Sequence, residues 1–181
     1  MRMHQKSLIK LIGEICGPCP ESGAEIGVYR GETSALLRSS FPACRMLFVD
    51  AWREWEEGAE YRRDTMGKLT QLEWDSVKHE AVLKISATVG APYSILQDTS
   101  ARAACTQPND SLDFVFIDAD HSYEAVKNDI FLWLPKVTRL ICGHDYHGKG
   151  SWKGVTRAVN EIFGESDVIS RRGLIWAYKI R

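Results

Sequence analysis

The chain has 181 residues, of which 44% are hydrophobic and 26% are charged. This length and composition fit one globular domain with a buried core and exclude wholesale disorder. Lys and Arg together number 23, and Asp and Glu 24, so the net charge is −1. That balance argues against a partner bound by charge, such as nucleic acid or an anionic membrane. We therefore expect a single domain over residues 1–181.

Three further features bear on location. No apolar run approaches the roughly 18–20 residues that a membrane helix requires. The N-terminal segment is interrupted by Lys10 and Glu14, so it lacks the unbroken apolar core of a signal peptide. The five cysteines are odd in number, which fits a reducing compartment better than a disulfide framework. These features predict a cytoplasmic protein without a membrane partner.

The first part of the chain alternates helices with short apolar strands. Apolar residues at helical spacing predict a helix over residues 7–15, and a buried strand follows at 24–28. The next helix covers residues 32–39. A second apolar strand, 46–49, ends at Asp50.

A long polar stretch, residues 52–92, follows with helical periodicity in its later half. It holds several aromatic residues among many charges: Trp52, Trp55, Tyr61 and Trp74. Its place after the second strand suits a lid or one wall of an acceptor-binding site. An amphipathic helix packed on the sheet is the alternative, and the pattern does not decide between them.

The rest of the chain continues the alternation. In chain order we expect strands at 93–96 and 112–117, a helix at 122–134, a strand at 137–142, a helix at 155–163, and strand-like runs at 168–169 and 174–180. Strands alternating with helices imply a mostly parallel sheet covered on both faces. The last two runs are separated by Arg171-Arg172-Gly173, a spacing typical of a hairpin, which adds an antiparallel edge. The predicted fold class is therefore α/β with seven strands.

Four of the predicted strands end in polar residues: Asp50, Asp98, Asp118 and the pair His144-Asp145. In open α/β sheets the ligand crevice lies outside the carboxyl ends of the strands. We therefore expect these side chains to converge on one site.

A glycine turn, Gly27 to Gly31, joins the first strand to the next helix. Glycines let a ligand approach the backbone closely, and a helix N-terminus offers free N–H groups. The dinucleotide pattern Gly-x-Gly-x-x-Gly would need glycines where Tyr29 and Glu32 stand, which argues against NAD. Asp50 lies 23 residues beyond Gly27, where a carboxylate can accept hydrogen bonds from both hydroxyls of a ribose. A turn that only reverses the chain is the alternative.

The motif Glu25-x-Gly27-x-x-x-Gly31, followed by an acidic strand end, resembles the first two motifs of class I methyltransferases that use S-adenosylmethionine (SAM). The runs FIDADHSY (116–123) and GHDY (143–146) resemble a small bacterial branch of that superfamily. That branch is itself similar to metal-assisted O-methyltransferases of sugars and natural products. The resemblance implies a Rossmann-like three-layer sandwich and methyl transfer from SAM.

The resemblance also implies a set of cofactor contacts. Around the methionine part it implies Glu25, Gly27, Tyr29, Gly31 and Thr33. At the ribose it implies Asp50, with Ala51 and Trp52 beside it, and at the adenine amino group Asp98, with Gln97 and Thr99. Val28 and Asp118 complete the expected cofactor-binding residues.

Methyl transfer requires that two reactants be positioned and that an acceptor hydroxyl lose its proton. A divalent cation can lower the pKa of that hydroxyl, or a histidine can act as the base. Asp118, His144 and Asp145 are the candidate metal ligands, and Asp118, His121 and His144 are the candidate catalytic residues. Magnesium prefers oxygen ligands, whereas the imidazole of His144 favours manganese, iron or zinc. A third explanation stays open, in which Asp118 caps a helix and His144-Asp145 only turns the chain.

The expected function is methyl transfer to a hydroxyl of a small molecule or a sugar, and a homodimer is left open. A non-catalytic nucleotide-binding module and a metal-dependent hydrolase are the alternatives. Cys16-Gly17-Pro18-Cys19 spells the thioredoxin tetrapeptide. It closes a predicted helix instead of opening one, so we favour a helix-ending turn over a redox role.

Overall fold

The computed structural model describes residues 2–54, 66–147 and 152–180. In these residues seven strands form one sheet: β1 (Ser22–Ile26), β2 (Arg45–Asp50), β3 (Tyr93–Gln97), β4 (Leu112–Ile117), β5 (Val137–Gly143), β6 (Ile169–Arg171) and β7 (Ile175–Lys179). The α-helices between them are α1 (Met3–Cys16), α2 (Glu32–Ser40), α3 (Gln71–Ser86), α4 (Ser100–Cys105), α5 (Tyr123–Trp133) and α6 (Lys153–Phe163).

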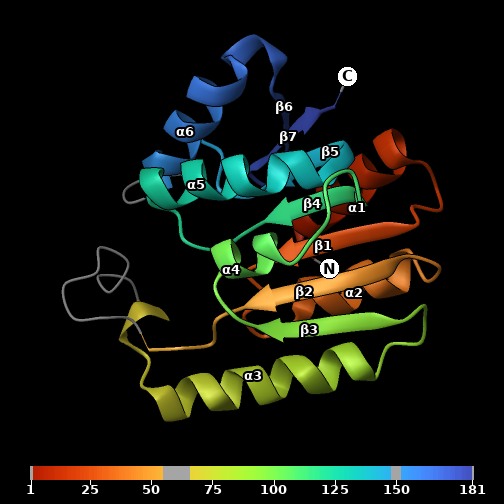
Figure 1. Ribbon diagram of the computed structural model, residues 1–181, viewed down its shortest axis with the longest axis vertical. Helices are drawn as coiled ribbons and strands as arrows, with labels where there is room; N and C mark the ends of the chain where they lie inside the picture. Colours follow the sequence, from red (N-terminus) through yellow and green to blue (C-terminus); the bar gives the residue numbers. More distant parts are fainter. Residues whose placement is uncertain (1, 55–65, 148–151, 181) are drawn as a thin grey trace.

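The strand order is β3-β2-β1-β4-β5-β7-β6 (Figure 1). The strands β1 to β5 pair in parallel with their neighbours, while β7 runs antiparallel to both β5 and β6. This arrangement confirms the predicted α/β fold with a mostly parallel sheet and an antiparallel C-terminal edge. In the C-terminal hairpin it is the second strand, β7, that pairs with β5, so β6 lies at the edge of the sheet.

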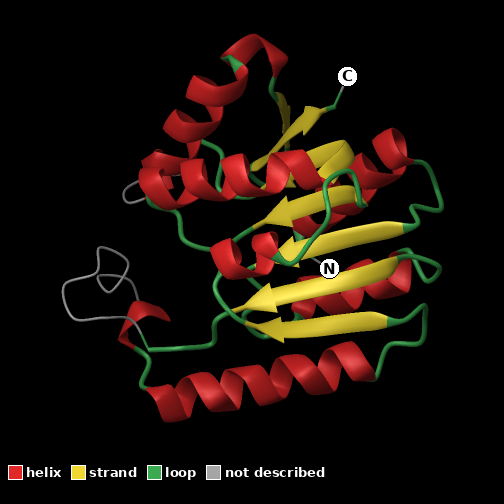
Figure 2. Cartoon of the chain, viewed as in Figure 1, coloured by secondary structure: helices red, strands yellow, loops and turns green. Residues whose placement is uncertain are grey.

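Helices cover both faces of the sheet, as Figure 2 shows, and each face has its own core. The helices α1, α2 and α3 contribute Leu11, Leu37 and Val77 to one core. The helices α4, α5 and α6 contribute other apolar side chains to the second core, among them Ala104, Ile130 and Val159. The molecule is therefore a three-layer sandwich.

The central strand β4 shows why this sheet is parallel and buried. All six of its residues are buried. Phe114 and Phe116 point into the core of α1 to α3, and Val115 and Ile117 point into the core of α4 to α6. A strand covered on both faces favours apolar residues on both sides, which explains the apolar run from Phe114 to Ile117. The exception is Asp113, which accepts a hydrogen bond from the Glu21 N–H and pairs with Arg139.

The observed elements differ from the predicted ones at three places. The helix α1 begins at Met3, four residues before the predicted helix 7–15. The predicted strand 24–28 begins and ends two residues earlier, because the positive φ of Gly27 starts the turn. The short helix α4 was not predicted, since its six residues are too few to show helical periodicity. Thr99 caps the N-terminus of α4, and its hydroxyl accepts a hydrogen bond from the Arg102 N–H at 3.4 Å.

Within the described residues, no helix has both the length and the apolar character needed to span a membrane.

Candidate active site

The carboxyl ends of three strands lie at one level of the sheet. Ile26 of β1 pairs with Val49 of β2 on one side and with Ile117 of β4 on the other. The residues that directly follow these three positions are Gly27, Asp50 and Asp118. The register of the sheet therefore brings the glycine turn and two carboxylates to a common edge.

Gly27 brings the turn after β1 against the turn after β4. Its φ is +91°, and a Cβ at this position would lie 2.1 Å from the carbonyl oxygen of Asp118. Its N–H donates to the Val49 carbonyl at 2.9 Å, and the Asp118 N–H donates to the Ile26 carbonyl at 2.8 Å. Only glycine satisfies both this conformation and this close approach.

The Asp50 carboxylate organises the glycine turn. Its Oδ2 accepts hydrogen bonds from the N–H groups of Val28, at 2.9 Å, and Tyr29, at 2.8 Å. Its Oδ1 accepts from the Trp52 N–H at 2.8 Å. Burial raises the pKa of Asp50, and the three N–H donors act against that shift. Each carboxylate oxygen has more than one lone pair, so Asp50 keeps acceptor capacity for a ligand.

A cavity of about 300 Å³ opens at this edge of the sheet. Its lining residues are Ile26, Gly27, Tyr29, Val49, Asp50, Ala51, Trp52, Arg53, Trp74, Asp98, Thr99, Ser100, Ala101, Asp118, Ala119, Asp120, Ala125, Asn128 and Asp129. They come from the glycine turn, the ends of β1 to β4, and the helices α3, α4 and α5. The cavity thus spans the edge at which the sequence predicted a ligand site.

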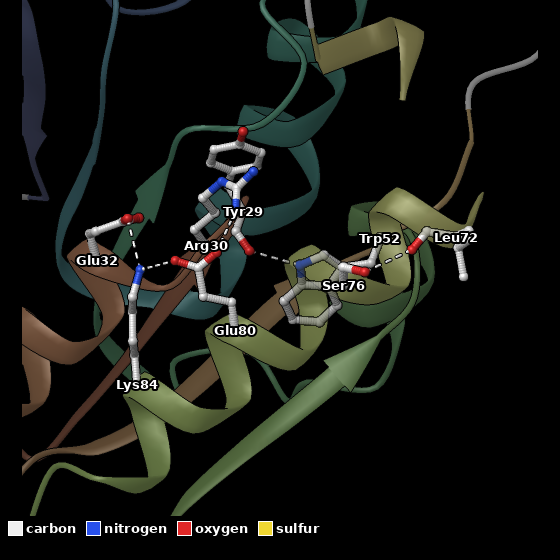
Figure 3. Close-up of polar contacts among 8 residues, drawn as sticks. All are labelled: Tyr29, Arg30, Glu32, Trp52, Leu72, Ser76, Glu80 and Lys84. Atoms are coloured by element: carbon white, nitrogen blue, oxygen red, sulfur yellow. Dashed lines mark hydrogen bonds and ion pairs between the residues drawn. The ribbon is translucent and has the colours of Figure 1, made fainter. Parts of the chain in front are cut away.

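The helix α3 contacts the glycine turn and the start of α2 through ion pairs (Figure 3). Glu80 of α3 pairs with Arg30 and lies 2.6 Å from the Lys84 ammonium, which in turn lies 2.8 Å from Glu32. A Cβ at Gly31 would lie 2.9 Å from the Cα of Ala81. The turn is therefore held between β4 on one side and α3 on the other.

A second cluster of polar side chains adjoins the cavity at Asp118. His121 Nε2 lies 2.8 Å from Asp145 Oδ2 and 3.5 Å from Asp118 Oδ1. His144 Nδ1 lies 3.3 Å from the same Asp145 oxygen and 3.5 Å from the same Asp118 oxygen. His144 Nε2 lies 3.0 Å from the Gly173 carbonyl oxygen. Because a carbonyl only accepts, Nε2 carries a proton and Nδ1 faces the two carboxylates.

Electrostatics couple the four side chains of this cluster. Burial opposes protonation of both imidazoles, but their hydrogen bonds to Asp118 and Asp145 outweigh it. The pKa rises to about 9 for His121 and to about 10 for His144. Burial raises the pKa of a carboxyl group, but the two imidazoles outweigh this effect and hold the pKa of both Asp118 and Asp145 below its usual value. Two positive and two negative charges therefore balance at the end of the cavity.

The sequence pattern of a family described as a methyltransferase domain matches residues 24–146. This match covers more than half of the chain and includes the glycine turn and the polar cluster. The chain belongs to this methyltransferase family.

Solved structures share the fold of this methyltransferase. The O-methyltransferase TomG from Streptomyces achromogenes, involved in tomaymycin synthesis and solved with SAM, is 16% identical with a TM-score of 0.65, covering 100% of this chain and 82% of that chain. The O-methyltransferase NovP is 17% identical with a TM-score of 0.66, over 98% and 79% of the two chains. An O-methyltransferase from Bacillus cereus, solved with S-adenosylhomocysteine (SAH), is 16% identical with a TM-score of 0.61, over 100% and 82%. No curated protein matches the sequence.

The methyltransferase cavity includes eight of the predicted cofactor residues: Gly27, Tyr29, Asp50, Ala51, Trp52, Asp98, Thr99 and Asp118. The other five do not line it: Glu25, Val28, Gly31, Thr33 and Gln97. Glu25 is buried and accepts a hydrogen bond from Ser34, while Gln97 binds Lys78 at 2.5 Å. Contact of these five with a cofactor stays a prediction.

The structure brings the three predicted metal ligands together and places a further imidazole beside them, and their binding of a metal stays a prediction. Asp118, His144 and Asp145 lie together, and His121 joins them. The atoms of Asp118, His121 and Asp145 that could bind a cation lie within 4.8 Å of one another. The ring of His4 lies 4.6 Å from that of His144. Sequence analysis missed His4, because only tertiary packing brings α1 to this end of the sheet.

Two other predicted features have simple structural outcomes. In the stretch 52–92, Trp52 and Trp74 line the cavity and α3 packs against the sheet, while Trp55 and Tyr61 lie outside the described residues. Cys16 ends α1 and is buried, and burial raises the pKa of its thiol to about 12. A redox thiol needs a lowered pKa and access to solvent, so the Cys16 site favours the helix-ending turn.

Proposed function

We propose that this methyltransferase transfers the methyl group of SAM to a hydroxyl oxygen of a small molecule or a sugar. One observation carries the proposal: Asp118 lines the cavity and also contacts both histidines of the polar cluster. A cofactor in the cavity would thus present its methyl group beside groups that can hold a proton. The structural neighbours TomG and the Bacillus cereus protein are O-methyltransferases solved with SAM and SAH.

We propose one direction for the cofactor along the cavity. In the strand order β3-β2-β1-β4, Asp50 at the end of β2 lies between Asp98, after β3, and Asp118, after β4, and it can accept hydrogen bonds from the two ribose hydroxyls. The methionine part then follows the glycine turn toward Asp118, and the adenine lies toward Asp98 and Thr99. This direction places the sulfonium next to the polar cluster, as the reaction requires.

The reaction itself is an in-line displacement. The acceptor oxygen forms a bond to the methyl carbon, the bond from carbon to sulfur breaks, and SAH leaves as a neutral thioether. The hydroxyl proton goes to the unprotonated ring nitrogen of His121 or His144 in its neutral form, and the raised pKa of both imidazoles favours its uptake. The protein contributes chiefly by holding the two reactants in line and by excluding competing orientations.

The cluster also fits a divalent cation. The Nε2 proton of His144 binds the Gly173 carbonyl, so its Nδ1 is directed to the carboxylates, which is the usual arrangement of a metal-binding imidazole. Asp118, His144 and Asp145 would hold the ion, with His121 as a further imidazole. This donor set favours manganese, iron or zinc over magnesium. A bound cation would lower the pKa of the acceptor hydroxyl.

Calorimetric titration with SAM and SAH tests the cofactor, and transfer of labelled methyl groups to a panel of hydroxylated compounds tests the reaction. We expect SAH binding and transfer to at least one acceptor. Binding without transfer to any hydroxyl would favour a non-catalytic module. Binding of neither cofactor would refute the proposal.

Titration with manganese and magnesium tests the cation separately. We expect manganese to bind in the wild type and to bind at least about tenfold more weakly in Asp145→Asn. No binding of either metal at about millimolar concentration, with or without SAH, would remove the cation and leave His121 or His144 as the base.

We also propose that residues 1–181 form one catalytic domain. The helix α1 packs against β4, β5 and β7, so segments from both ends of the chain share one core. Limited proteolysis would contradict this proposal if it released a stable part that still bound SAH.

A further inference from the structure

A buried carboxyl group that neither the glycine turn nor the polar cluster uses lies in the wall of the cavity. Asp129, on α5, is only 5% exposed and lines the cavity with Asn128 and Ala125 from the same helix. A hydrogen bond joins it to Ser100, which begins α4 directly after Thr99. Asp129 therefore belongs to the end of the cavity at which β3 finishes.

The surroundings of Asp129 do not favour its negative charge. In the described part of the chain no cation forms an ion pair with it; Arg102 of α4 pairs with Asp98, and Lys127 of α5 with Glu161. Asp120, in the loop after β4, adds a second negative charge.

The hydroxyl of Ser100 donates a hydrogen bond to Asp129. Ser100 Oγ accepts a hydrogen bond from the indole N–H of Trp133 at 2.9 Å, so the proton of the Ser100 hydroxyl is available to the Asp129 carboxyl. Burial raises the pKa of Asp129 to about 6, the Ser100 hydrogen bond opposes that rise, and Asp120 adds to it. The Asp129 carboxyl therefore takes up a proton at a higher pH than an ordinary aspartic acid does.

A neutral carboxyl group has a distinctive recognition chemistry. It presents a carbonyl acceptor and a hydroxyl donor side by side, as a carboxamide does. Adenine presents the complementary pair, an amino donor next to a ring nitrogen acceptor, and carboxamides bind that edge with two hydrogen bonds. An ionised carboxylate would bind the amino group but would repel the lone pair of the ring nitrogen.

Asp98, the residue that the sequence predicted for this role, cannot supply the donor. Its Oδ1 accepts the Thr99 N–H at 2.8 Å, and its Oδ2 lies 3.2 Å from Arg102 Nε. Both oxygens of Asp98 therefore already face donors of the protein. A base bound at this end therefore needs another group to satisfy its ring nitrogen.

We infer that Asp129 binds the adenine base of the cofactor as a neutral carboxylic acid, accepting from the amino group and donating to the adjacent ring nitrogen. The inference rests on the proposed function, because it takes the cavity to be the SAM site. It adds a dependence on proton concentration to that site. Cofactor affinity falls as pH rises through the pKa of Asp129, because the ionised form must first take up a proton.

Calorimetry across about pH 5.5 to 8 tests the inference in the full chain. The probes are SAH and 5′-methylthioadenosine, which keeps adenine and ribose but lacks the titratable amino-acid part. In the wild type we expect the Kd of both probes to rise by about tenfold or more between the ends of this range. In Asp129→Asn the amide supplies the same acceptor and donor at every pH, so both affinities stay level.

Two outcomes would overturn the inference while leaving the proposed function intact. One is the same pH profile in the wild type and in Asp129→Asn. The other is a profile seen with SAH but absent with 5′-methylthioadenosine, which would place the titrating group at the amino-acid end. If the wild type bound neither probe at any pH, the proposed function itself would fail.

A set of ligands tests the same contact in the wild type alone, so the result does not depend on how a variant folds. Adenosine, 1-deazaadenosine and 7-deazaadenosine share the amino group, and each deaza compound lacks one ring nitrogen. We expect one of the two to bind about tenfold more weakly at low pH and to lose the pH dependence. Equal pH profiles for all three compounds would overturn the inference.

Discussion

At the scale of the residue, Asp50 shows how one side chain serves both fold and site. Its carboxylate accepts hydrogen bonds from three backbone N–H groups, which belong to the glycine turn and to the segment after β2. The same group lines the cavity. The turn is therefore shaped before a cofactor arrives, which lowers the ordering cost of binding.

Replacement of Asp50 by alanine should weaken both stability and cofactor binding. Three backbone donors lose their acceptor, and the cost of leaving such donors unsatisfied is about 1–3 kcal/mol. We expect a loss of that size in urea unfolding and a rise of about tenfold or more in the Kd for SAH by calorimetry. Asp50→Asn keeps one acceptor oxygen and should give an intermediate result. An alanine variant with unchanged stability would contradict this account of the turn.

Asp129 leads to a prediction about the unliganded protein. Its pKa is about 6 in the folded state and about 3.9 in the unfolded chain. The folded state thus binds the proton more tightly, so this group's contribution to stability is greatest below pH 3.9 and is lost as pH rises through 6. Relative to the wild type, Asp129→Asn should therefore gain unfolding free energy between about pH 4 and 7, by at most about 3 kcal/mol.

Urea unfolding of both proteins at several pH values measures this difference. Comparing the two proteins cancels the other groups that titrate in the same range. A stability difference that does not change with pH would show that Asp129 is ionised in the folded state throughout.

At the scale of the element, α3 contacts the glycine turn through ion pairs and through close backbone packing, and the two kinds of contact differ in strength. Ion pairs join Glu80 and Lys84 to the turn, but these side chains are about one third or more exposed. Exposed ion pairs contribute little, typically about 0–1 kcal/mol. The backbone contact of Gly31 with Ala81 leaves no room for a Cβ. Close packing should therefore dominate.

Two substitutions separate these contributions. Gly31→Ala places a Cβ 2.9 Å from the Cα of Ala81 at a φ of +76°, so we expect a loss of about 2 kcal/mol or more in unfolding free energy. Glu80→Gln removes only the charge between Arg30 and Lys84 and should cost less than about 1 kcal/mol. Chemical denaturation ranks the two. A larger effect of Glu80→Gln would show that the ion pairs hold the helix.

The helix α5 shows how far a sequence pattern can lead. Its buried positions are Val126, Asp129, Ile130 and Trp133, which follow helical spacing. A charged residue within this apolar stripe was visible in the sequence and indicates a buried carboxyl group. Periodicity alone did not show that this stripe borders a cavity. That fact depends on α4, which places Ser100 beside Asp129 and was itself too short to predict.

At the scale of the whole molecule, ligand binding should appear as a shift in unfolding temperature. SAH at about one hundred times its Kd should add about 2.7 kcal/mol, which corresponds to about 5–10 °C for a chain of this size. Manganese should add a further increase in the wild type, and a chelator should reverse it. An equal manganese effect in Asp145→Asn would show that the ion binds away from the polar cluster.

The sequence by itself determined the α/β class, the seven strands and the polar residues at the strand ends. These features depend on local periodicity and on glycine spacing, which neighbouring residues express directly. The register of β1 against β2 and β4 then made Gly27, Asp50 and Asp118 meet, as the strand ends predicted.

Only the tertiary structure decided which polar groups share a cavity and in what state of charge. His4 reaches His144 because the turn before β7 packs on the start of α1. Asp129 faces the end of β3 because α4 and α5 pack together. Both contacts join residues far apart in the chain, and both change the local balance of burial and charge. Proton affinity follows from that balance, so no local pattern in the sequence could express it.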